Sequence, residues 1–246
     1  MAPLHKINPL RVLYLDTHVN LAGKKLLDVG CGGGIFSESL AARGAQVIAI
    51  DPSQQLIDIA QKHQQSQQQQ DITSAEPATS TIPVGESSDS NNKTLNEPAQ
   101  IDYLCCDTRQ LVQDKKRLDS FDIVSCMEVL EHVDDPSKLV KECISLLKPG
   151  GVAYFSTINR TLTSFLQAIA LAEYVLRWLP QGTHSHSKFI PPAELADWLT
   201  AAAAPPFSIK GMTYDLSSMS FQLSRDTDVN YLLLARKDKS SHKSNL

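Results

Sequence analysis

Apolar residues along this chain fall in short runs, separated by segments in which they recur every three or four positions. Five runs have the length and composition of buried strands: 26–29, 46–50, 101–106, 121–126 and 152–157. Segments with helical spacing follow four of them: 35–43, 53–63, 110–118 and 136–147. Strands that alternate with helices in this way predict a parallel sheet in an α/β fold.

Two later apolar runs differ, because only a short polar turn separates them. They span 219–223 and 229–235 and follow a helix predicted over 191–198. Strands joined by a short turn pair in antiparallel fashion. We therefore expect a hairpin at one edge of the sheet, close to the C-terminus.

Three segments interrupt the alternation of strands and helices. Near the N-terminus, Asn8 can cap a short helix whose first position is Pro9. Residues 64–99 are mostly Gln, Ser, Thr, Asn and Pro, and such a composition predicts a disordered insertion, since it buries too little apolar surface to offset the entropy of ordering. Residues 161–183 are more apolar than one buried helical face requires, which predicts either a lid or an interfacial helix.

Composition limits the domain count and the classes of partner. A chain of 246 residues with 42% hydrophobic content fits a single domain over 1–246. A net charge of −4 and a pI near 6.0 give no basic surface for nucleic acid. The five cysteines are odd in number and lack a Cys-x-x-Cys pair, which is typical of reduced thiols. No apolar run is long enough to cross a membrane, and residues 1–6 do not form a signal peptide.

The first strand ends in a glycine-rich turn at Gly30, Gly32 and Gly34. Glycines adopt positive φ and carry no Cβ, so a ligand can approach this backbone closely. A dinucleotide fingerprint places a small residue where this chain has Ile35, and no Gly-Lys-Ser/Thr sequence marks a P-loop. The turn therefore predicts a ligand other than a dinucleotide or a P-loop nucleotide.

The pattern Asp28-x-Gly30-x-Gly32-x-Gly34 resembles the first motif of the S-adenosylmethionine-dependent methyltransferases, over residues 24–157. The resemblance implies a seven-stranded, mostly parallel, Rossmann-like methyltransferase sheet that ends in an antiparallel hairpin. It also implies that the Asp28–Gly34 motif binds the cofactor and that Asp51 accepts hydrogen bonds from both ribose hydroxyls. Asp51 ends the second strand, as an acidic ribose-binding residue does in such sheets.

Two further residues are similar to those that approach the adenine in that superfamily. Asp107 follows the third strand, and Met127 follows the fourth. Each has an alternative role: Asp107 can simply cap the next helix, and Met127 can simply fill the core.

Closer resemblance is to the ubiquinone-biosynthesis O-methyltransferase family. It is carried by the residues 7–11, 126–133, 156–160, 172–177, 182–184, 188–190, 192–195 and 228–231. The resemblance implies methylation of catechol hydroxyls on polyprenylated intermediates, at two steps of the pathway. It supports a role for Arg11, whose guanidinium can pair with the methionine carboxylate of the cofactor. An Arg on the surface is the alternative.

A catechol hydroxyl is weakly acidic and needs a base or a metal to react. Glu128, Glu131 and His132 stand at i, i+3 and i+4, so a helix would place them on one face. The resemblance implies that they bind Mg²⁺, although a Leu-Glu-His-Val segment also occurs in methyltransferases that use no metal. The candidate bases are His132 and His184, the latter in a loop after the apolar segment.

A polyprenylated catechol resides in a bilayer, which gives residues 161–190 a use as a lid or membrane-interface segment. We therefore expect a peripheral protein whose partners are this substrate, the membrane surface and other ubiquinone-biosynthesis proteins. The insertion favours the matrix side of the mitochondrial inner membrane over a bacterial cytoplasm. In the family another helix precedes residues 7–11, so a cap over the cofactor is expected to be missing. Two rival functions remain. One is a soluble methyltransferase that acts on another phenol or carboxylate, and the other is a catalytically silent scaffold that holds a ubiquinone-biosynthesis complex together.

Overall fold

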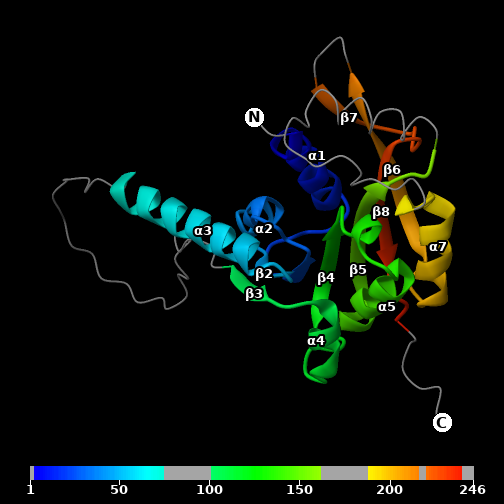
Figure 1. Cartoon of the computed structure of the whole chain (residues 1–246), viewed down its shortest axis with the longest axis horizontal. Coiled ribbons are helices and arrows are strands. Elements are labelled where there is room, and N and C mark those ends of the chain that lie inside the picture. Colours follow the sequence, from blue (N-terminus) through cyan, green and yellow to red (C-terminus); the bar gives the residue numbers. More distant parts are fainter. Residues whose placement is uncertain (1–2, 75–100, 162–187, 216–219, 240–246) are drawn as a thin grey trace, which may run out of the picture.

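An eight-stranded sheet forms the centre of the structure, a computed structural model that describes residues 3–74, 101–161, 188–215 and 220–239. The strand order is β3-β2-β1-β4-β5-β8-β6-β7 (Figure 1). The parallel strands are β1 (Lys25–Val29), β2 (Gln46–Asp51), β3 (Asp102–Cys105), β4 (Phe121–Met127) and β5 (Leu147–Ile158). The antiparallel strands are β6 (Pro206–Asp215), β7 (Ser220–Ser224) and β8 (Asn230–Arg236).

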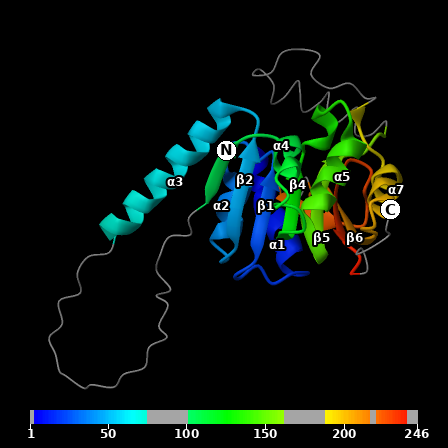
Figure 2. The ribbon, with the colours of Figure 1, turned by 90° about the horizontal axis from the view of Figure 1, so that it is seen from below.

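Helices cover both faces of this sheet (Figures 1 and 2). One face packs against α1 (Pro3–Asp16), α2 (Ile35–Ala41) and α3 (Gln54–Ser74). The other packs against α4 (Thr108–Gln113), α5 (Pro136–Leu146) and α7 (Pro192–Ala201). Neighbouring residues along β1 alternate between these layers, with Leu26 in one and Leu27 in the other, as the period of two in a strand requires. The α/β prediction is confirmed.

The C-terminal strands correct two predictions. The described residues contain eight strands, namely the seven expected and the additional strand β6. The predicted partners β7 and β8 do not pair with each other: β7 pairs with β6, and β8 lies between β5 and β6. The hydrophobic pattern of the sequence did not reveal β6. Its apolar residues Phe207 and Ile209 are 43% and 41% exposed, so they do not mark a buried face.

Two helices also differ from the predicted boundaries. The first begins at Pro3 and contains Pro9, so Asn8 is not its cap. Asn8 instead donates hydrogen bonds from Nδ2 to Ile35 O (3.2 Å) and Ser39 Oγ (2.8 Å), which joins α1 to α2. The helix α3 continues to Ser74, into the predicted insertion, because glutamine favours helices. It projects away from the sheet in Figures 1 and 2, and 75–100 lie outside the described residues.

Most of the predicted lid or interfacial segment lies outside the described residues, which omit 162–187. Within the described part of the chain, no helix has both the length and the apolar content to span a bilayer.

Candidate active site

A pocket of about 390 Å³ opens where four parallel strands end. One residue at or near the carboxyl end of each strand lines it: Val29, Ile50, Cys106 and Val129. Ligands of open α/β sheets bind at this edge. The rest of the lining comes from the loops and helices that follow these strands: Gly30, Pro52, Asp107, Thr108, Arg109, His132, Val133, Asp134, Asp135, Lys138, Leu139 and Glu142.

The glycine turn lies tightly against β2, β3 and the segment that follows β4. Gly30 and Cys31 both donate their backbone N–H to Ile50 O, at 2.8 and 3.0 Å. Gly30 has a φ of +70°, and a Cβ there would collide with the Val129 side chain after β4. Gly34 has a φ of +86°, and a Cβ there would collide with the Tyr103 hydroxyl. The turn thus needs glycine for backbone conformation and for close packing.

Asp51 holds the end of β2 to this turn. Its Oδ2 accepts a hydrogen bond from Gly32 N at 3.0 Å, and its Oδ1 accepts one from Ser53 N at 2.9 Å. The residue is 7% exposed. These contacts bring Asp51 beside the glycine turn.

Asp28 lies inside the sheet and supports the turn from within. It is 2% exposed, and its carboxylate accepts hydrogen bonds from Ser37 Oγ (2.6 Å) and Ser125 Oγ (2.7 Å). Burial raises the pKa of Asp28 to about 6, against the lowering effect of the two serines. Asp28 therefore ties β1 to α2 and β4.

Arg11 and Glu128 form an ion pair at the end of β4. Arg11 Nη2 donates to Glu128 Oε1 at 2.7 Å, and Ser156 Oγ donates to the same oxygen at 2.8 Å. Arg11 is 5% exposed, and its buried Nε finds no hydrogen-bond partner among the described residues. The guanidinium thus has an unused donor in a buried position, contrary to the surface alternative.

The three predicted magnesium ligands are not gathered into one group in the described residues, although the carboxyl groups of Glu128 and Glu131 lie near each other. Glu128 has a left-handed φ of +55°, so no α-helix begins there, and only Leu130–His132 form a 3₁₀ turn. Glu128 faces Arg11, Glu131 accepts a hydrogen bond from Thr157 Oγ1 at 2.7 Å, and the exposed His132 lines the pocket. Across the described ranges no group of three His, Cys, Asp or Glu side chains is placed to hold a metal. This arrangement does not fit Mg²⁺, which needs several oxygens around it.

Glu131 is a carboxyl group kept from solvent. It is 4% exposed, and burial raises its pKa to about 8, with a further rise from the negative charge of Glu128. Glu131 therefore keeps its proton to a higher pH than an ordinary glutamate does.

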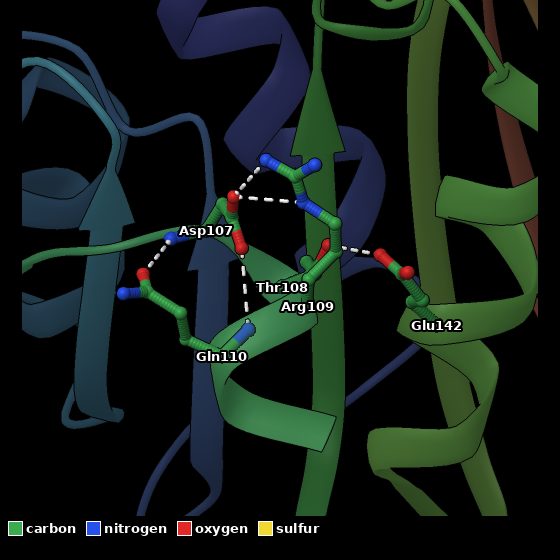
Figure 3. Close-up of polar contacts among 5 residues, drawn as sticks. All are labelled: Asp107, Thr108, Arg109, Gln110 and Glu142. Carbon is green, nitrogen blue, oxygen red and sulfur yellow. Dashed lines mark hydrogen bonds and ion pairs between the residues drawn. The ribbon is translucent and has the colours of Figure 1, made fainter. Parts of the chain in front are cut away.

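Asp107 lines the pocket and also caps a helix, as its alternative role predicts. Its Oδ1 accepts a hydrogen bond from Gln110 N at 3.2 Å, while Gln110 Oε1 accepts one from Asp107 N at 3.0 Å. Its Oδ2 accepts from the guanidinium of Arg109 (Figure 3). The Arg109 hydrogen bonds hold the pKa of Asp107 below its usual value.

Two other predicted residues have different outcomes. Met127 ends β4 and is 8% exposed, within the core layer that contains α1 to α3. His184 lies outside the described residues.

Sequence reasoning missed the pocket residues Thr108, Arg109 and Glu142. Asp107 and Gln110 have the spacing of a capping box, which would have located the start of α4 and with it Thr108 and Arg109. Glu142 had no local signal, because α5 brings it to the pocket from 34 residues beyond Thr108.

Comparison with known proteins agrees with this geometry. A family model described as a methyltransferase domain matches residues 6–203. The chain is similar to proteins named ubiquinone biosynthesis O-methyltransferase. One from Coxiella burnetii is 43% identical, covering 94% of this chain and 85% of the relative, and one from Marinobacter nauticus is 42% identical, covering 95% and 86%. In fold the chain is similar to a magnesium protoporphyrin IX methyltransferase from Synechocystis with bound SAH, with a TM-score of 0.60 and 20% identity over 95% of this chain and 84% of that one.

Proposed function

Because the chain belongs to the ubiquinone biosynthesis O-methyltransferase family, we propose that it methylates catechol hydroxyls of polyprenylated ubiquinone precursors, at both O-methylation steps. The family makes the chain an S-adenosylmethionine-dependent methyltransferase. The observation that carries the proposal is the identity of 43% over 94% of the chain. The pocket at the carboxyl ends of β1 to β4 supports it, because Gly30, the first residue of the glycine turn, lines it.

The residues around this pocket fit S-adenosylmethionine. At Gly32 nothing lies within 4 Å of an added Cβ, which leaves open backbone for the methionine part, and Asp51 beside it is suited to the ribose hydroxyls. Asp107 on the pocket wall and Met127 at the end of β4 are suited to the adenine. The buried Arg11 Nε, with no hydrogen-bond partner within the described residues, is suited to the methionine carboxylate.

When bound, this cofactor supplies a methyl group on a sulfonium, which is open to in-line attack by an oxygen. The protein then has to orient the hydroxyl and remove its proton. His132 at the pocket and His184 are the proposed bases. Neither role needs Mg²⁺, and Glu128, Glu131 and His132 do not form one group of metal ligands within the described residues.

We also propose that residues 161–190 contact the membrane surface as a lid or interface segment, beside other ubiquinone-biosynthesis proteins. Deleting residues 164–179 should abolish co-sedimentation with liposomes, and unchanged binding would contradict the proposal. The named relatives come from bacteria. They favour the bacterial, membrane-associated location over the mitochondrial one.

The deciding experiment is methyl transfer to a short-chain polyprenyl catechol, with and without EDTA. Turnover supports the proposed substrate, and turnover with a soluble phenol alone would support the soluble alternative. Activity that EDTA removes and magnesium restores would support a metal at residues 128, 131 and 132. Activity that EDTA leaves intact would support a base without a metal.

A binding measurement separates the enzyme from a silent scaffold. Calorimetry should show that S-adenosylhomocysteine binds the wild-type chain and binds Asp51→Asn more weakly. Asp58→Asn is the matched control, since Asp58 is an exposed residue of α3 that pairs with Gln54. The absence of binding to the wild-type chain would favour the scaffold.

A further inference from the structure

The carboxylate of Asp107 has no unused oxygen in the structure. Oδ1 is held by Gln110 N within the capping box. Oδ2 accepts from Arg109 Nε at 2.9 Å and from Arg109 Nη2 at 2.5 Å (Figure 3). A carboxylate oxygen offers about two lone pairs, so Arg109 occupies both acceptor positions of Oδ2, and one position remains on Oδ1.

Arg109 lies between two acidic side chains of the pocket, those of Asp107 and Glu142. Asp107, Arg109 and Glu142 all line it, and the guanidinium feels the charge of both carboxylates. Glu142 itself is fixed by Thr108 Oγ1, which donates to its Oε2 at 2.5 Å and joins α4 to α5. The Arg109 side chain is 69% exposed, so it can move without disturbing the core.

We propose that Arg109 is a specificity-determining residue of the adenosyl site, which competes with the 6-amino group of the purine for Asp107 Oδ2. The proposal rests on the proposed function, since it needs the adenine to approach Asp107. The capping box keeps the carboxylate in place, so the exchange requires only that a guanidinium N–H leave Oδ2. The displaced guanidinium remains in solvent near Glu142.

The same geometry makes Arg109 discriminate between purines. A 6-amino group donates a hydrogen bond and therefore replaces Arg109 on Asp107. A 6-oxo group accepts one, so it can take an N–H from Arg109 and cannot itself donate to Asp107. The donor of hypoxanthine is N1–H, which lies one ring position away from the place of the 6-amino group. Arg109 thus weakens binding of adenine and favours binding of hypoxanthine. It therefore reduces the preference of the site for adenine over hypoxanthine.

The test compares S-adenosylhomocysteine with S-inosylhomocysteine by calorimetry, in the wild-type chain, Arg109→Met and Arg109→Lys. Methionine keeps the length of the side chain and removes its donors. Because exposed ion pairs are weak, we expect Arg109→Met to bind S-adenosylhomocysteine about two- to five-fold more tightly. It should bind S-inosylhomocysteine no more tightly than the wild-type chain does. The affinity of Arg109→Lys for S-adenosylhomocysteine should lie between those of the wild-type chain and Arg109→Met.

Arg43→Met is the matched control, because it removes an exposed arginine that pairs with Asp16 far from this pocket. It should leave both affinities and their ratio unchanged. An unchanged ratio of the two affinities in Arg109→Met, or weaker binding of S-adenosylhomocysteine, would overturn the inference. Failure of the wild-type chain to bind S-adenosylhomocysteine would instead overturn the proposed function.

Discussion

Arg11 Nη2 lies 2.7 Å from Glu128 Oε1, although 117 residues separate the two along the chain. The pair joins α1 to the end of β4. The Arg11 side chain is 6% exposed and that of Glu128 is 22% exposed, so water screens the interaction weakly. Arg11, which is predicted to bind the carboxylate of the cofactor, therefore already binds a carboxylate of the protein itself.

Arg11→Met should destabilise the protein and weaken cofactor binding. Loss of a hydrogen bond between charged groups lowers the free energy of unfolding by about 2 kcal/mol. Part of this loss comes from leaving Glu128 without its partner, so Glu128→Gln in the Arg11→Met background should restore some stability. Urea unfolding of the single and double variants measures this, and equal stability of the two would show that the pair is not the cause.

Asp28→Ala should lower stability more than a surface change does. It leaves the Ser37 and Ser125 hydroxyls, both 0% exposed residues, without their shared acceptor. An unsatisfied buried polar group costs about 1–3 kcal/mol, so we expect a loss of about 2–4 kcal/mol in urea unfolding. Asp58→Ala on the exposed side of α3 is the control and should change stability little. Similar losses in both variants would contradict a supporting role for Asp28.

Gly30→Ala should be more harmful than Gly23→Ala, although both positions have φ near +70°. At Gly23 nothing lies within 4 Å of an added Cβ, so that variant reports backbone strain alone. At Gly30 the Cβ also meets Val129. Gly23→Ala should lose only the strain energy of about 1–2 kcal/mol. Gly30→Ala should lose more stability than this in thermal unfolding, and it should also bind S-adenosylhomocysteine more weakly. Val129→Ala should recover part of the defect, and no recovery would point away from the steric contact.

Glu131 should make the stability of the protein depend on pH. Its pKa rises from the ordinary 4.5 to about 8, so the folded state holds the proton more tightly than the unfolded chain. The resulting stabilisation is complete below about pH 4.5 and is lost as the pH rises through 8. Glu131→Gln imitates the protonated form and should flatten the profile, above all between pH 6 and 8, where Asp28 with its pKa of about 6 contributes little.

Urea unfolding at several pH values checks this, with Glu194→Gln as the control for a partly exposed carboxylate. An unchanged slope in Glu131→Gln between pH 6 and 8 would show that another group carries the pH dependence.

Local patterns in the sequence determined the parallel half of the fold. Short apolar runs and helical spacing located β1 to β5 and the helices between them, because a strand buried on both faces is apolar throughout and a helix repeats its buried face every three or four residues. The glycine turn, Asp51 and Asp107 were predictable for the same reason: parallel strands bring their carboxyl ends to one edge, where the residues after them meet.

Only the tertiary structure decided which distant segments pair. The sequence does not state that β8 enters between β5 and β6, because a strand edge accepts any partner whose register buries the right face. Nor does spacing show that Glu128 turns to Arg11 through a left-handed backbone while Glu131 is buried beside Thr157. The i, i+3 and i+4 positions share a face only within a helix, and here packing on α1 and β5 replaced the helix by a turn. The chain's local repeats thus locate the edge where the parallel strands end, and a contact across 117 residues pairs the charges of Arg11 and Glu128 there.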